Sequence, residues 1–103
     1  MLSRFVLLCF VSAGAVFGQA APPAVPDSVI AESNVSYSAV GGRQNLDIFR
    51  PRAASATPLP AVLLVHGGGF TAGAKEEYRD LAIKLAQRGY VAASANYRLA
   101  PRN

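Results

Sequence analysis

An apolar pentapeptide followed by a histidine and three glycines is the feature that most constrains this chain. Residues 61–65, Ala-Val-Leu-Leu-Val, form an uninterrupted apolar run that begins after Pro60 and leads into His66 and the glycines at 67–69. A short run of this kind predicts a strand buried on both faces, as in a parallel sheet covered by helices. Three successive glycines remove every Cβ from the loop and leave its backbone N–H groups open to close approach. Such a loop is suited to presenting N–H donors to an anion or to a developing negative charge.

The first twenty residues have the layout of a secretory signal peptide. Arg4 precedes an apolar run, residues 5–10, and small residues follow as far as Gly18-Gln19-Ala20. A charged start, an apolar middle and small residues at the cleavage site are typical of exported chains. The apolar stretch is short for a membrane span and is interrupted by glycines. We therefore expect cleavage after Ala20, a secreted or periplasmic product, and no membrane association once the signal is removed.

Composition narrows the classes of partner and cofactor. The 103 residues leave room for one small domain at most, and a hydrophobic content of 51% is enough to build a core. The formal charge is +4, but the basic residues are scattered and are not interleaved with aromatic side chains, so a nucleic-acid partner is not expected. Cys9 is the only cysteine and lies in the predicted signal. The mature chain would thus have no disulfide, no thiol nucleophile and no cysteine-based metal site, and no organic cofactor is implied.

The remaining elements predict an α/β arrangement. We divide the chain into a signal peptide (residues 1–20), a proline-containing linker (21–32) and a domain (33–103). Alternation over 35–40, the pair Gly41-Gly42 and alternation around Asp47 predict a β-hairpin. Apolar residues at helical spacing predict a helix over 75–88, ended by Gly89, and 90–95 reads as a second buried strand. A hairpin followed by a β-α-β unit of a mostly parallel sheet is the expected architecture.

Three kinds of site could be built from the glycine loop. A dinucleotide site fits Gly67 to Ala72 as G-x-G-x-x-A, but Ala95 and Asn96 stand where the ribose-binding acid is expected. A phosphate-binding loop fails, because Ala74 replaces its lysine. The third possibility is an oxyanion hole, in which glycine N–H groups stabilise the oxyanion of an acyl-transfer intermediate.

The segments His66-Gly67-Gly68-Gly69-Phe70 and, some thirty residues later, Asn96-Tyr97-Arg98-Leu99-Ala100-Pro101 resemble the α/β-hydrolase superfamily. The likeness is to its esterase and lipase branch with the HGGG motif, which includes hormone-sensitive-lipase-like and feruloyl or acetyl-xylan esterase-like enzymes. It extends over 35–103 and implies the N-terminal part of an α/β-hydrolase fold. The implied activity is that of a serine hydrolase, a secreted carboxylic ester hydrolase acting on a small-molecule ester.

The resemblance also implies roles for individual residues. Gly68 and Gly69 would supply the backbone N–H groups of the oxyanion hole. His66 and Gly67 would brace the loop, since the catalytic histidine of this family comes late in the chain. Phe70 would be a wall of the acyl pocket or part of the core, at a place where many relatives carry tryptophan.

The catalytic triad is not found in these 103 residues. No G-x-S-x-G is present, and Ser94, the only serine after the glycine loop, lacks flanking glycines. In this fold the order is serine, acid, histidine, so all three are expected beyond Asn103. We therefore expect a fragment that is inactive alone and has a bare edge on strand 61–65. The alternatives are a non-catalytic secreted binding module and the N-terminal part of a related peptidase.

Overall fold

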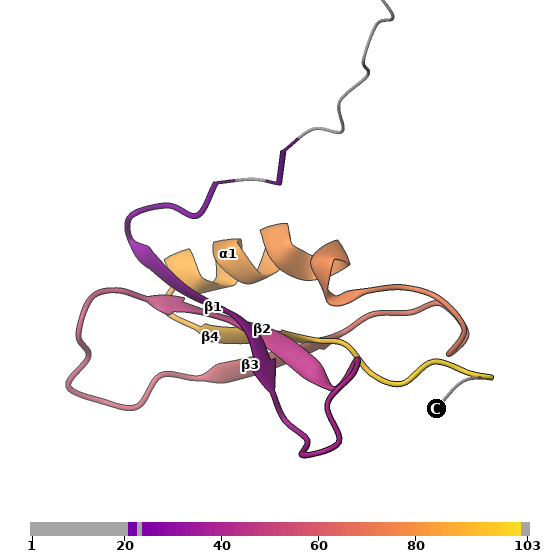
Figure 1. Ribbon diagram of the computed structural model, residues 1–103. Coiled ribbons are helices and arrows are strands. Elements are labelled where there is room, and N and C mark those ends of the chain that lie inside the picture. Colours follow the sequence, from indigo (N-terminus) through magenta and orange to yellow (C-terminus); the bar gives the residue numbers. More distant parts are fainter. Residues whose placement is uncertain (1–20, 23, 102–103) are drawn as a thin grey trace, which may run out of the picture.

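The computed structural model describes residues 21–22 and 24–101, which form one mixed sheet and one helical segment (Figure 1). The predicted signal peptide and Cys9 lie outside the described residues. In chain order the elements are β1 (Val29–Ser36), β2 (Asn45–Pro51), β3 (Ala61–Val65), the 3₁₀ turn η1 (Lys75–Tyr78), α1 (Arg79–Gln87) and β4 (Val91–Ala95). The four strands lie side by side in the order β1-β2-β4-β3.

The N-terminal hairpin is confirmed, but its first strand was placed too late along the chain. β1 pairs antiparallel with β2 from Val29 opposite Pro51 to Ser36 opposite Asn45, and residues 37–44 form the connection. Gly41 and Gly42 lie in that connection with φ values of 75° and 67°, as a turn requires. β1 begins within the segment 21–32 expected to be a linker, because Val29, only 2% exposed, packs into the core.

The β-α-β unit is also confirmed. β3 pairs parallel with β4, from Ala61 opposite Val91 to Val65 opposite Ala95. The predicted helix is divided into η1 and α1, and it ends where Gly89 adopts a φ of 94°. The N–H groups of Gly89 and Tyr90 donate to the carbonyls of Ala86 and Leu85, at 3.1 Å in each case. These bonds satisfy carbonyls that the end of the helix leaves free.

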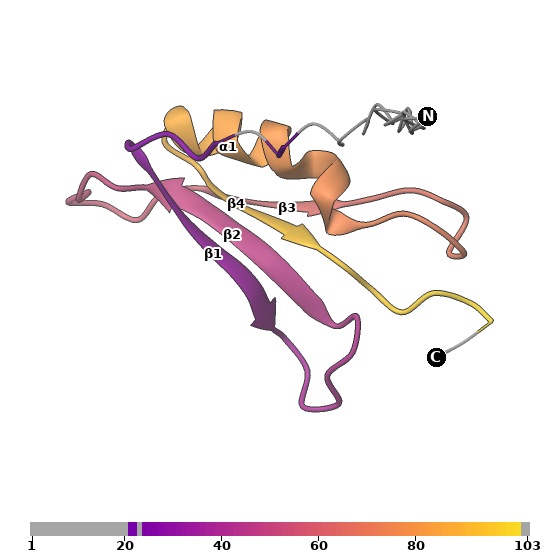
Figure 2. The ribbon, with the colours of Figure 1, turned by 45° about the horizontal axis from the view of Figure 1, so that its top comes forward.

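The core lies between α1 and one face of the sheet (Figure 2). Phe49 of β2 is fully buried, and its ring lies 5.4 Å from the guanidinium carbon of Arg79. Ala92 of β4 and three residues of α1 complete the buried cluster with Val29 and Phe49; the helical residues are Ala82, Ile83 and Ala86. Alanines on the facing elements, Ala92 on β4 and Ala82 and Ala86 on α1, allow the helix to approach the sheet closely.

The opposite face of the sheet is open within the described residues. β3 is an edge strand, as expected, but the prediction that it is buried on both faces was wrong. Its side chains alternate, and the exposed fractions of Leu63 and Val65 are 63% and 55%. The reason is that α1 covers one face only; on the other face Leu63 and Val65 line a cavity together with Tyr37 and Phe70. No helix in the described part of the chain has the length and apolar character needed to cross a membrane.

Candidate active site

The glycine loop connects the carboxyl end of β3 to η1 and folds back on itself. Gly68, Gly69 and Phe70 have positive φ values of 124°, 62° and 63°. The carbonyl of Gly68 accepts hydrogen bonds from the N–H groups of Thr71 and Ala72, at 3.2 Å each, and from the Thr71 hydroxyl at 3.1 Å. These bonds close a tight turn directly after the strand.

Two of the loop glycines are required by close packing as well as by backbone conformation. A Cβ on Gly68 would overlap the carbonyl group of Ala72. A Cβ on Gly73, whose φ is 101°, would overlap the imidazole of His66 and the carbonyl of Gly67. A side chain at either position would therefore collide with the opposite end of the loop.

The backbone N–H groups of Gly68 and Gly69 are the next feature of the loop. Both residues are exposed, and neither N–H donates a hydrogen bond within the described part of the chain. They follow the carboxyl end of a parallel strand, which is where α/β sheets place their ligands. Two N–H groups without a hydrogen bond among the described residues thus lie directly after the carboxyl end of β3.

His66 lies under the loop and is 3% exposed. Its ring is stacked on Tyr97, with centroids 4.3 Å apart and an angle of 13° between the planes. Nδ1 lies 2.7 Å from the carbonyl oxygen of Gly67, so Nδ1 carries the proton and donates to it. Nε2 is buried and has no hydrogen-bond partner among the described residues. The side chain is thus engaged with the backbone of its own loop.

Tyr97 connects the loop to the end of β4. Its hydroxyl donates to the carbonyl of His66 at 2.7 Å, and the ring of Phe70 meets it edge-on at 6.2 Å. The carbonyl of Phe70 accepts from the N–H of Ala100 at 2.7 Å, while the Phe70 side chain is 72% exposed. A cavity of about 430 Å³ lies beside these rings on the open face of the sheet and is lined mainly by apolar side chains, including Leu63 and Val65.

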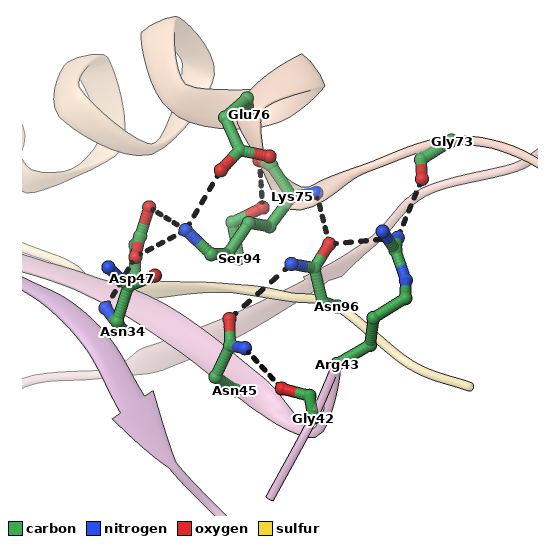
Figure 3. A network of polar contacts seen from close by, with 10 residues as sticks. All are labelled: Asn34, Gly42, Arg43, Asn45, Asp47, Gly73, Lys75, Glu76, Ser94 and Asn96. Atoms are coloured by element: carbon green, nitrogen blue, oxygen red, sulfur yellow. Dashed lines mark hydrogen bonds and ion pairs between the residues drawn. The ribbon is translucent and has the colours of Figure 1, made fainter. Parts of the chain in front are cut away.

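The far end of the loop meets a buried ion pair (Figure 3). Lys75 Nζ lies 2.8 Å from both carboxylate oxygens of Asp47, and the two residues are 4% and 5% exposed. Burial by itself lowers the pKa of Lys75, but the hydrogen bonds and negative charges of Asp47 and Glu76 outweigh it and raise that pKa above its ordinary value. For Glu76, burial acts to raise the pKa, but the hydrogen bond from Lys75 lowers it overall.

Sequence reasoning missed this pair. Asp47 alternates with Leu46 and Ile48, and that alternation suggests a solvent-facing carboxylate. The structure turns Asp47 to the α1 side of β2, together with Phe49, while Leu46 and Ile48 are half-buried on the other side. One sequence signal was available. Phe49 is two residues after Asp47, so in a strand both side chains lie on the same face, and the large apolar Phe49 marks that face as the core.

Within the described residues, Ser94 does not lie at the loop with a free hydroxyl, and no metal-binding cluster is found. Ser94 is 1% exposed in β4, and its hydroxyl donates to the carbonyl of Lys75 at 2.7 Å. Within 21–22 and 24–101, no three His, Cys, Asp or Glu side chains are grouped to hold a metal ion. The site as described therefore consists of backbone donors and the side chains that surround them.

A family model described as BD-FAE matches residues 46–103, more than half of the chain. The non-reducing polyketide synthase adrD of Penicillium rubens is 34% identical over 83 residues, covering 77% of this chain and 3% of that protein. The probable carboxylic ester hydrolase LipM of Mycobacterium tuberculosis is 32% identical over 74 residues, covering 70% of this chain and 17% of that protein.

The fold is similar to that of known esterases. The crystal structure of inhibited esterase B from Lactobacillus rhamnosis superposes with a TM-score of 0.66 at 30% identity, covering 76% of this chain and 26% of that chain. The chain thus spans only a small part of the length of each relative. The sheet and helix described here superpose on about a quarter of the esterase B chain.

Proposed function

The chain belongs to the BD-FAE family, within the α/β-hydrolase superfamily, and on that premise we propose that it is the N-terminal portion of a secreted carboxylic ester hydrolase. The substrate in this proposal is a small-molecule ester with a small acyl or sugar-linked group. Neither a metal nor an organic cofactor takes part in the proposed reaction. The signal-peptide pattern of residues 1–20 is the basis for proposing export to the periplasm or the medium.

The observation that carries the proposal is the pair of free N–H groups on Gly68 and Gly69 at the end of β3. When a nucleophile attacks an ester, the carbonyl oxygen gains negative charge, and preorganised donors stabilise that charge. One such donor typically contributes about 3 to 4 kcal/mol to the transition state. In the proposed enzyme Gly68 and Gly69 are these donors, His66 and Gly67 hold the loop, and Phe70 is a wall of the acyl pocket.

The nucleophile in this proposal comes from sequence beyond Asn103. The chain contains no G-x-S-x-G, and Ser94 is buried in β4 with its hydroxyl already bonded to Lys75. We therefore propose that the 103 residues alone are inactive. Loss of the serine or histidine of such a triad lowers turnover on the order of a million-fold.

The test is to read the native gene past the codon for Asn103 and to assay the complete product. We expect an open frame that encodes G-x-S-x-G followed by an acid and a histidine. We also expect the product to hydrolyse p-nitrophenyl acetate or butyrate, and its serine-to-alanine variant to lose that activity. A complete product without hydrolysis of any short-chain ester would contradict the proposal.

A second candidate function is that of a non-catalytic secreted binding module. The exposed apolar side chains of Leu63, Val65 and Phe70 beside the edge strand favour it. This candidate requires a genuine stop codon after Asn103 and a stable secreted product, so the same gene sequence distinguishes it from the hydrolase.

A further inference from the structure

Lys75 fixes the position at which the glycine loop ends. Its backbone N–H donates to Asn96 Oδ1 at 2.8 Å, and its carbonyl accepts from Ser94 at 2.7 Å. Its ammonium group is bonded to both oxygens of Asp47 at 2.8 Å and to Glu76 at 2.9 Å. These contacts attach one residue to β2 and to the end of β4 at once (Figure 3).

Arg43 holds the residue on the other side of Ala74. Its Nη2 donates to the carbonyl of Gly73 at 2.8 Å and to Asn96 Oδ1 at 3.3 Å. Its Nε donates to the carbonyl of Tyr97 at 3.3 Å. Arg43 comes from the connection between β1 and β2, so three separate segments converge where the loop ends (Figure 3).

Packing within the loop transmits this position to the proposed oxyanion donors. Gly73 lies so near His66 and Gly67 that a Cβ would overlap the imidazole and the carbonyl, and the carbonyl of Gly68 accepts from the N–H of Ala72 at 3.2 Å. Close-packed backbone groups cannot move past one another without a change in the loop path. A shift of Gly73 or Lys75 would therefore displace the peptide groups of Gly68 and Gly69.

The chemistry of the Lys75–Asp47 ion pair, called the anchor below, favours a role in positioning the loop over a role in stabilising the fold. Taking two charges out of water offsets most of their attraction, and an apolar pair of similar volume is often at least as stable. An apolar pair cannot orient its neighbours, because apolar contacts have no preferred direction. The three N–H donors of an ammonium group, in contrast, form directional hydrogen bonds with particular acceptors. The carboxylate of Asp47 is itself held by the N–H of Asn34 at 2.9 Å.

We infer that Lys75 and Asp47, together with Asn96 and Arg43, are positioning residues that hold Gly68 and Gly69 in the geometry required for ester hydrolysis. They touch neither the substrate nor the reacting atoms, and they act through the backbone of the loop. This inference rests on the proposed function, because it assigns the purpose of the anchor to the oxyanion donors.

The experiment compares Lys75→Met/Asp47→Leu with the wild type in the complete gene product. The double substitution removes both charges and retains similar volume, so no unpaired charge remains buried. We expect the thermal midpoint to stay near that of the wild type, KM for p-nitrophenyl butyrate to be unchanged, and kcat to fall about tenfold to a hundredfold. Active sites are counted by titration with a phosphonate ester, so that loss of folded enzyme is not read as loss of kcat.

The matched control is Lys84→Met/Asp80→Leu. That pair is also 2.8 Å apart, but it lies on the exposed side of α1 and has no contact with the loop, so kcat and KM should not change. Arg43→Gln is a second variant that removes the bond to Gly73 without changing the buried pair. It should lower kcat several-fold at constant KM.

Wild-type kcat per active site in the folded Lys75→Met/Asp47→Leu product overturns the inference and leaves the proposed function in place. If that product does not fold, wild-type kcat in Arg43→Gln overturns it instead. A wild-type product that hydrolyses no ester removes the proposed function and, with it, the inference.

Discussion

Replacing Gly68 by alanine in the complete gene product should remove most ester hydrolysis while the fold is retained. The φ of Gly68 is 124°, and a Cβ built on it lies 2.6 Å from the carbonyl carbon of Ala72. That neighbour is backbone, so it cannot rotate away as a flexible side chain would. The turn between Gly68 and Ala72 must open, and the peptide groups of Gly68 and Gly69 must move with it.

The expected magnitude has two parts. Backbone strain at a positive φ costs about 1 to 3 kcal/mol, and because the loop is exposed, the free energy of unfolding should fall by no more than about that amount. Displacement of one oxyanion donor lowers kcat by about 10² to 10³, equivalent to about 3 to 4 kcal/mol in the transition state. The loss of activity should therefore be much larger than the loss of stability.

The assay measures kcat and KM for p-nitrophenyl butyrate and the free energy of unfolding in denaturant. Gly41→Ala is the matched control, because Gly41 also has a positive φ, 75°, but nothing lies within 4 Å of its Cβ position. It should cost a similar strain energy and leave kcat unchanged. Wild-type kcat in Gly68→Ala, or equal losses in both variants, would refute the reasoning.

Other contacts of the fold can be tested in the same product. Tyr97→Phe removes the hydroxyl that donates to the carbonyl of His66 at 2.7 Å. The free energy of unfolding should fall by about 0.5 to 1.5 kcal/mol, and kcat should fall while KM is retained. Unchanged kcat and unchanged stability would contradict this prediction. Phe49→Ala empties a fully buried site beneath α1 and should cost about 3 to 5 kcal/mol in a denaturant titration, whereas a loss near that of an exposed site would argue against the described core. The pKa of Lys75 lies above its ordinary 10.5, so its stabilising contribution is present below pH 10.5 and is lost as pH rises through the raised pKa. The difference in unfolding free energy between wild type and Lys75→Met/Asp47→Leu, which leaves no buried carboxylate unpaired, should accordingly be constant across the neutral range and shrink in strong alkali. A difference that shrinks near neutrality would oppose that direction of shift.

The sequence predicted the elements whose signals are local. The apolar run before three glycines became β3, the helical spacing after Lys75 became η1 and α1, and Gly89 ended the helix. The position of β1 was not predictable in the same way. Its residues alternate weakly and most of them are exposed, so its register was decided by pairing with β2 and by the burial of Val29.

The candidate site was predicted in part. Gly68 and Gly69 were named from the resemblance to the HGGG esterases; the structure gives both a positive φ, and a Cβ on Gly68 would overlap the backbone of Ala72. Sequence reasoning assigned Lys75 to the start of a helix and Asp47 to the second strand of the hairpin, without pairing the two. The residues next to Lys75 or Asp47 in the sequence do not indicate the ion pair, because the two are 28 residues apart.

By itself the sequence determined which segment would be a glycine loop after a strand and which segments would flank it, because strand and helix periodicity and glycine conformation are properties of neighbouring residues. Only the tertiary structure decided that one face of β3 is open, that Asp47 turns inward, and that Lys75, Asn96 and Arg43 meet where the loop ends. The physical reason is that burial and ion pairing depend on which elements pack together in space. The order of the strands in the sheet and the position of α1 determine which residues are buried or paired. No single stretch of the sequence carries that information.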